Sequence, residues 1–166
     1  MRKFINVNKK DQLILENQFS ELLNIANGEP TDNYYFLAVS VFDHWLDYDE
    51  SMELLHLTNK EECIRRCNLF NDFNKIIIEN TSISTFRFKG RYSENTIFKK
   101  FTSDSSKYDY MTQKDNGEYC VVLPDIGAIY LEGYDDTNIF YFTDSSVKPI
   151  IENWAKDSGL YCLTKK

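Results

Sequence analysis

The sequence predicts an α+β protein with a mainly helical N-terminal half and an antiparallel β meander in the C-terminal half, against which a C-terminal helix packs. Before about residue 80, apolar residues recur at helical spacing; after it, they alternate or form short runs between turn-forming residues. The chain has no internal repeat and no domain linker. At 166 residues it is therefore expected to form a single globular domain, 1–166.

Two segments of the first half have clear helical patterns. The first runs from about Lys9 to Ala26, with apolar residues near one face and Gly28 and Pro30 as a stop. The second covers residues 58–78 and carries an apolar stripe. Two overlapping capping patterns mark its start: Thr58 with Glu61, and Asn59 with Glu62.

The segment 34–50, "YYFLAVSVFDHWLDYDE", is compatible with either type of element. Its aromatic and β-branched content is typical of a strand that is buried on both faces. However, Ser40, Asp43, His44 and Asp47 recur at helical spacing. We favour a helix and keep the strand as the alternative.

After Asn80 the period changes to that of strands. In "SISTFRFKG", Phe86 and Phe88 alternate with Arg87 and Lys89. The further predicted strands are 96–101, 118–123, 128–133 and 138–143, with a long polar loop over 102–117 and turns at "PDIG" and "YDDT".

The chain should close with a helix and a short edge strand. The helix is predicted over 144–159, with Ser145 or Ser146 as its cap, Pro149 in or near the first turn and Gly159 at its end. The strand "LYCL" follows.

Charge is segregated along the chain, whose net charge is −7. Residues 43–62 hold seven acidic residues and one basic residue, and residues 115–138 hold six acidic residues and no basic one. Residues 84–107 hold six basic residues and two acidic ones. The acidic balance argues against nucleic-acid binding through a broadly basic surface. The basic run 86–100 interleaves aromatics with Arg and Lys, as single-strand binders do, but we favour the solvated face of a strand.

Location and thiol state are inferred from what the chain lacks. The N-terminal stretch "MRKFINVNKKDQ" has no apolar run of signal-peptide length, and no segment approaches the roughly 20 apolar residues needed to span a bilayer. We expect a cytoplasmic protein with reduced cysteines and no membrane association. Cys63 and Cys67 lie one helical turn apart rather than in a C-x-x-C motif, and all four cysteines are predicted to be buried as small hydrophobes.

Asp135 and Asp136 do not fit a calcium loop. Ile139 and Phe140 occupy positions where an EF-hand needs ligands or glycine, so a hairpin turn is the better interpretation.

Two other pairs define the alternative hypothesis, a metal-dependent enzyme or metal-binding protein. Asp125 and Glu132 partly match a nuclease pattern, but Tyr134 replaces the expected lysine; Glu53 and His56 form one E-x-x-H pair. No P-loop, G-x-S-x-G, H-E-x-x-H or G-x-G-x-x-G motif is present. We therefore predict no enzymatic activity, no cofactor and no metal.

The size, acidity and layout of the chain resemble those of the small acidic immunity proteins that bacteria encode beside interbacterial toxins, most clearly over "YLEGYDDTNIFYFTDSSVKPIIENWAKDSGLYCL", residues 130–163. The resemblance implies a binding inhibitor that blocks the active site or substrate access of a cognate protein toxin. A basic nuclease would suit the acidic surface, because opposite charge steers association. The predicted partner-binding residues are Asp43, Trp45, Asp47, Tyr48, Asp49, Glu50, Tyr134, Asp135 and Asp136. Tyr130 is a further candidate anchor.

Overall fold

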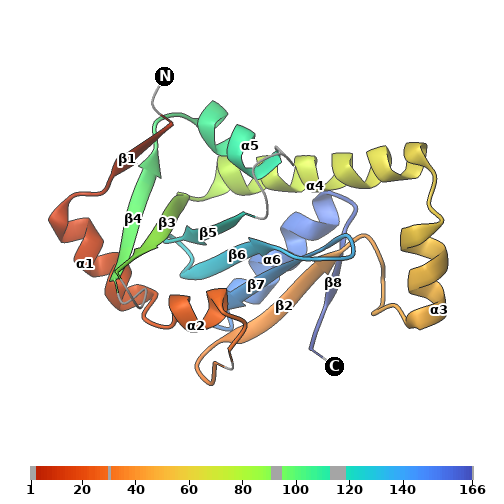
Figure 1. Cartoon of the computed structure of the whole chain (residues 1–166), viewed down its shortest axis with the longest axis horizontal. Coiled ribbons are helices and arrows are strands. Elements are labelled where there is room, and N and C mark those ends of the chain that lie inside the picture. Colours follow the sequence, from red (N-terminus) through yellow and green to blue (C-terminus); the bar gives the residue numbers. More distant parts are fainter. Residues whose placement is uncertain (1–2, 30, 91–94, 113–118, 166) are drawn as a thin grey trace.

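The computed structural model describes residues 3–29, 31–90, 95–112 and 119–165. Within these ranges the protein is α+β: one antiparallel sheet with helices on both faces (Figure 1). Some residues used in the sequence predictions lie outside the described ranges, namely Pro30, Arg91, Glu94, Asp115 and Glu118.

The strands are β1 (Phe4–Asn6), β2 (Tyr35–Ser40), β3 (Ser84–Lys89), β4 (Asn95–Phe101), β5 (Cys120–Leu123), β6 (Ala128–Glu132), β7 (Thr137–Phe142) and β8 (Tyr161–Leu163). They form an eight-stranded sheet in the order β1-β4-β3-β5-β6-β7-β2-β8. The helices are α1 (Lys9–Gln18), α2 (Leu22–Ala26), α3 (Tyr48–Ser51), α4 (Lys60–Asn80), α5 (Asp104–Thr112) and α6 (Val147–Asp157). A π-helical segment, η1 (Met52–His56), continues α3.

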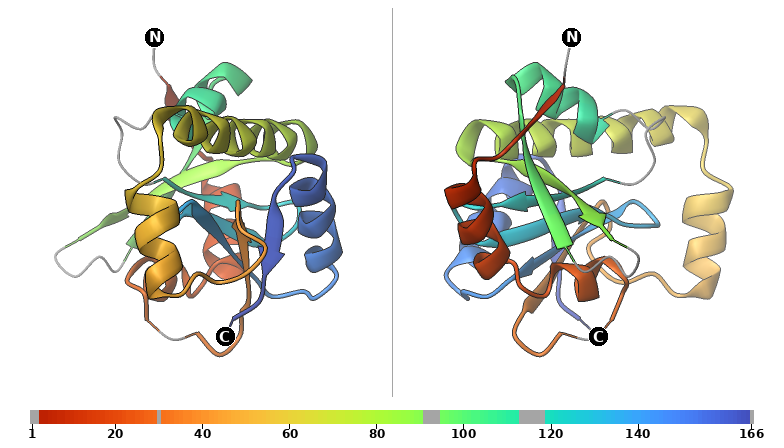
Figure 2. Two further views of the ribbon diagram at one scale, coloured as in Figure 1. Left: turned by 90° about the vertical axis from the view of Figure 1, so that its right-hand side faces the viewer. Right: turned by 60° about the vertical axis from the view of Figure 1, so that its left-hand side comes forward.

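Each face of the sheet has its own apolar core, because side chains alternate along the strands. On one face, α1 and α2 pack through Phe19 and Leu22 against Ile129. On the other face, α4, α5 and α6 contribute to a larger core around the fully buried Tyr130 and Phe140. Figure 2 shows the two sets of helices on opposite sides of the sheet.

Several predictions are confirmed. The strands β5, β6 and β7 pair consecutively as an antiparallel meander, and α6 packs on the sheet through its apolar face. Asn59 is the residue that caps α4, and its side chain accepts a hydrogen bond from the backbone N–H of Glu62 at 2.9 Å. In β3, Phe86 is half-buried and Arg87 is exposed, as the alternation predicts.

The favoured helix over 34–50 is wrong, because residues 35–40 form β2. This strand lies inside the sheet, between β7 and β8, and its residues Leu37 to Ser40 are all buried. A strand covered on both faces reads as a continuous apolar run, which hides its period. The polar residues that gave the segment its helical spacing are spread over several elements: Ser40 ends β2, Asp43 and His44 lie in the loop after it, and Asp47 caps α3.

The structure differs from the predicted elements in three further places. The predicted polar loop over 102–117 contains α5, and β1 was not predicted. The first helix is divided into α1 and α2, with Phe19 ending α1. The N-terminal half thus supplies two strands in addition to its helices. The edge position of β8 is confirmed.

Among the described residues, no helix combines the length and apolar character that crossing a bilayer requires.

Candidate functional site

The two acidic segments meet at one end of the sheet. Strands β2 and β7 are antiparallel neighbours, so the last residue of β2, Ser40, pairs with the first residue of β7, Thr137. The backbone N–H of Val41 also donates to the carbonyl of Asp136 at 3.3 Å. The loop after β2 therefore lies beside the β6–β7 turn, although the two are far apart in sequence.

The predicted hairpin turn at 134–137 is present. The N–H of Thr137 donates to the carbonyl of Tyr134 at 3.1 Å, and both central residues are left-handed, Asp135 with φ 60° and Asp136 with φ 51°. Positive φ at both positions defines a type I′ turn, whose twist matches the flanking strands. Aspartate tolerates this backbone region better than most residues do.

A buried arginine holds this turn in place. The Arg66 guanidinium, on α4, donates to the Asp136 carboxylate at 3.0 Å, the Glu62 carboxylate at 2.9 Å and the carbonyl of Leu54 at 2.8 Å. It also lies 5.0 Å from the centre of the Phe42 ring. Arg66 is only 5% exposed, so these contacts join the turn, α4 and η1 in one polar cluster.

Arg65 and Arg66 also set the ionisation of Glu62. Both guanidiniums donate to its carboxylate, which lowers the pKa of Glu62 to about 2. Arg66 was not among the predicted site residues, although its position in the sequence held a signal. Arg66 is seven residues before Phe73 and eleven before Ile77, on the face of α4 that enters the core.

A helical arm formed by α3 and η1, residues 48–56, stands beyond the edge of the sheet (Figure 1). None of its residues is buried. Asp47 caps the arm in a reciprocal capping box with Glu50. Tyr48, which is 77% exposed, and Met52 present apolar surface to solvent.

His44 connects the loop after β2 to the arm. Its ring nitrogens lie 2.6 Å from the Asp43 carboxylate and 2.9 Å from the Glu50 carboxylate. The hydrogen bonds to Asp43 and Glu50 raise the pKa of His44, and the pKa values of both carboxyls are lowered. No sequence pattern singled out this three-residue cluster.

A cavity of about 270 Å³ separates the arm and its loop from the body. Trp45 and Ser51 line it from the arm side, and Tyr134, Asp135 and Leu163 line it from the body. The Trp45 indole N–H donates to the carbonyl of Thr164 at 2.7 Å, which fixes the ring. Below, we call this space the arm cavity.

The structure gives the predicted partner-binding residues different surroundings. Four carboxylates already have intramolecular contacts: Asp43 and Glu50 with His44, Asp47 in the capping box, and Asp136 with Arg66.

The remaining predicted residues are more open. The carboxylates of Asp49 and Asp135 make no hydrogen bond or ion pair within the described part of the chain. Tyr134 is 76% exposed and Trp45 is half-buried. Tyr130 is 0% exposed, so the suggestion that it anchors a partner is wrong.

The two residue pairs of the alternative metal hypothesis, Asp125 with Glu132 and Glu53 with His56, do not lie near further metal ligands in the described ranges. Asp125 lies in the β5–β6 turn, where its carboxylate accepts a hydrogen bond from the backbone N–H of Ser82 at 2.7 Å. Glu132 is the last residue of β6, at the end of the strand away from this turn. At about 3.3 Å per residue, the length of β6 separates the two carboxylates too widely for one ion. Glu53 and His56 are both exposed on η1. In the described ranges, no group of three or more His, Cys, Asp or Glu side chains could hold a metal ion.

The prediction that all four cysteines are buried is wrong for one of them and holds only in part for the other three. Cys63 is exposed, whereas Cys67, Cys120 and Cys162 are partly buried. Burial raises the pKa of Cys120 to about 12 and that of Cys162 to about 11, so these two thiols are protonated at neutral pH.

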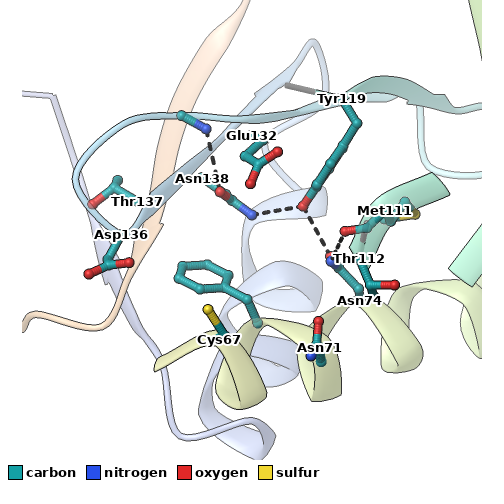
Figure 3. A pocket seen from close by; sticks show the side chains of 12 residues that line it. Cys67, Asn71, Asn74, Met111, Thr112, Tyr119, Glu132, Asp136, Thr137 and Asn138 are labelled. Atoms are coloured by element: carbon teal, nitrogen blue, oxygen red, sulfur yellow. Dashed lines mark hydrogen bonds between the residues drawn. The ribbon is translucent and has the colours of Figure 1, made fainter. Parts of the chain in front are cut away.

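A second cavity, of about 130 Å³, lies between α4, α5 and the β6–β7 hairpin. Figure 3 shows Tyr119, Asn74 and Asn138 pointing toward one another at its inner end. The Tyr119 hydroxyl donates to that of Tyr130 at 2.9 Å, which in turn donates to the Asn74 side-chain carbonyl at 2.8 Å. The Asn138 amide donates to both hydroxyls.

This network satisfies its own polar groups, and among the described residues no buried side-chain nitrogen or oxygen lacks a partner. Its cavity is well below the roughly 300–1,000 Å³ of small-molecule sites. The network therefore orders the core between α4 and the meander, and the acidic end with its arm is the better candidate for a functional surface.

Comparison with known proteins gives no family assignment: no protein-family model, no curated protein and no solved structure matches this chain.

Proposed function

We propose that this protein is a binding inhibitor, an immunity protein that neutralises a cognate bacterial toxin by occluding its active site or substrate access. The observation that carries the proposal is the helical arm 48–56, which has no buried side chain and stands beside the Tyr134–Asp136 turn. In this proposal the protein acts by contact alone, without catalysis, in the cytoplasm.

The arm is unusual as a purely structural element. Short helices gain most of their stability from an apolar face packed against the protein, yet this arm exposes Tyr48 and Met52. Leu57, just after the arm, is 77% exposed. Tyrosine and methionine are enriched at protein interfaces relative to other surfaces. A partner seated on the arm would bury the apolar surface that the protein itself leaves open.

The negative charge of Asp49 and Asp135 favours a protein partner with a basic surface. Asp49 and Asp135, whose carboxylates make no hydrogen bond or ion pair with the described residues, lie on the two sides of this end of the molecule. Their charge attracts a basic surface and repels nucleic acid. A basic toxin such as a nuclease would be steered to this end, with a faster association at low salt.

The direct test uses the product of the gene adjacent to this one, which the proposal requires to be a toxin. Its growth inhibition and its affinity for the purified protein are measured with wild type, with an Asp49→Lys/Asp135→Lys double variant and with a Tyr48→Ala variant. We expect the double variant to lower the association rate and its salt dependence, and Tyr48→Ala to speed dissociation.

The matched control reverses charge elsewhere on the surface. Glu79→Lys lies near the far end of α4, is exposed, and changes net charge by the same amount per site. It should leave both rates close to wild type. Wild-type affinity in the double variant and in Tyr48→Ala would refute a toxin-binding role for this end.

A further inference from the structure

We infer that the arm cavity binds the side chain of an arginine on the partner protein. This inference rests on the proposed function for the source of the arginine, but the recognition chemistry belongs to the cavity itself. The arm cavity offers a fixed aromatic wall, an available carboxylate and an apolar floor, contributed by Trp45, Asp135 and Leu163.

The aromatic wall is held in a set orientation. The Trp45 indole donates to the carbonyl of Thr164 at 2.7 Å and stacks on Phe36, with ring centroids 6.3 Å apart and an interplanar angle of 28°. Phe42 and Tyr134 line the same space. A guanidinium stacks on aromatic faces and tryptophan is the best of them, so a ring fixed before binding favours this cation.

The charge balance around the arm cavity selects a cation. Two basic side chains near the arm cavity already contact carboxylates of the protein itself: Arg66 contacts Glu62 and Asp136, and His44 contacts Asp43 and Glu50. Asp135 lines the arm cavity, and its carboxylate makes no hydrogen bond or ion pair with the described residues. A carboxylate without a cationic partner favours a cationic ligand over an anionic or acidic one.

The size of the arm cavity fits one side chain better than a separate small molecule. Its volume of about 270 Å³ is just below the roughly 300–1,000 Å³ of small-molecule sites. Ile139 and Leu163 supply apolar contacts for the methylene stem of a long basic side chain. Arginine suits this site better than lysine, because its planar head can stack on Trp45 and pair with Asp135 through two hydrogen bonds.

The test needs no partner protein. The full chain, labelled with ¹⁵N, is titrated with N-acetyl-arginine amide, and the indole N–H signals of its two tryptophans are followed by NMR. We expect a saturable shift of the Trp45 signal, while Trp154, buried in α6, serves as an internal reference. N-acetyl-glutamine amide, a neutral probe with a similar hydrogen-bonding head, should give no saturable shift.

Two variants test the role of the carboxylate. Asp135→Asn keeps the turn, because asparagine also tolerates positive φ, and should weaken binding of the arginine probe about two- to fivefold. Glu79→Gln removes a remote exposed charge and should not weaken it. Equal shifts with both probes, no shift of Trp45, or unchanged binding in Asp135→Asn would each overturn the inference.

The result separates this inference from the proposed function. Binding of the arginine probe at Trp45, together with no affinity for the adjacent toxin, would uphold the cation site and reject the immunity role. Toxin binding without any response of Trp45 to the arginine probe would uphold the immunity role and reject the cation site.

Discussion

Arg66 and Asp136 form an ion pair, 3.0 Å from Nη1 to Oδ2, in which the guanidinium side chain is 6% exposed and the carboxylate 36% exposed. The pair joins the middle of the chain to a turn seventy residues later. Asp136 thus neutralises a buried charge within the protein. In the proposed function, Asp136 positions its neighbours Tyr134 and Asp135.

Replacing Arg66 should destabilise the protein. Arg66→Met removes the donor to Asp136, Glu62 and Leu54, and we expect a loss of about 2–3 kcal/mol in the free energy of unfolding. This is below the value for a fully buried pair, because water reaches the two carboxylates. Urea denaturation measures the change.

The neighbouring Arg65 provides the control. It pairs with the same carboxylate of Glu62, but its side chain is 57% exposed. Arg65→Met should cost less than about 1 kcal/mol. Equal losses in the two variants would contradict a special role for the buried guanidinium.

The β6–β7 turn should depend on residues that tolerate positive φ. Asp135 has φ 60°, so Asp135→Val should lower the free energy of unfolding by about 1–2 kcal/mol, while Asp135→Asn should be nearly neutral. Thermal denaturation of the two variants checks this. A valine variant as stable as wild type would argue against the type I′ turn.

Acid should weaken the cluster around Glu62. Its pKa in the folded protein is about 2, below the ordinary value of 4.5, so the folded state binds fewer protons than the unfolded state. The stability that Glu62 contributes is complete above about pH 4.5 and is lost as the pH falls toward 2.

Glu62→Gln isolates this effect from that of the other carboxylates. The difference in unfolding free energy between wild type and Glu62→Gln, measured by urea denaturation at several pH values, should shrink from pH 4.5 to 2. A difference that does not change with pH would exclude the guanidinium contacts as the cause.

His44 should titrate above its ordinary pKa of 6.5, because the Asp43 and Glu50 carboxylates hold its protonated form. The stability from these contacts is present below pH 6.5 and is lost as the pH rises through the folded-state pKa. NMR titration of the imidazole C–H signals measures that pKa, with His56→Gln used to assign the two histidines. Asp43→Asn should lower the pKa of His44; an unchanged value would show that the contact does not form in solution.

The buried tyrosine network should be costly to break. Tyr130→Phe removes the hydroxyl that donates to Asn74 and accepts from Asn138, and should lower the free energy of unfolding by about 1–3 kcal/mol. Tyr35→Phe, at a tyrosine that is 54% exposed, should change it by less than about 0.5 kcal/mol. Urea denaturation of both variants is the measurement, and similar small effects would mean that water replaces the lost hydroxyl.

Much of the second half of the fold could be predicted, since strands with one exposed face alternate and turn residues mark their ends. The exceptions have physical causes. In β2, burial on both faces removed the alternation, and Asp43, His44 and Asp47 mimicked a helical period. In α5 only Ser106 and Met111 are buried, so its sequence has no apolar stripe. Its start is fixed locally, with the Ser103 hydroxyl accepting from the N–H of Ser106 at 3.1 Å.

The candidate site could be predicted as a set of acidic segments, but not as an arrangement. Sequence composition placed charge at 43–50 and 134–136, whereas only the pairing of β2 with β7 shows that the two are neighbours. Whether a given aspartate is available also depends on tertiary partners. Asp135 and Asp136 are adjacent and chemically identical, yet only Asp136 reaches Arg66.

The strand order has a consequence for the approach of another molecule. The basic residues Arg87, Lys89, Lys99 and Lys100 lie on β3 and β4, toward one edge of the sheet, and the acidic arm lies beyond the opposite edge. This separation contributes a component across the strands to the electric dipole moment of the protein. In the field of a charged protein, such a dipole experiences a torque. This component would turn the arm toward a cationic surface before the two molecules touch.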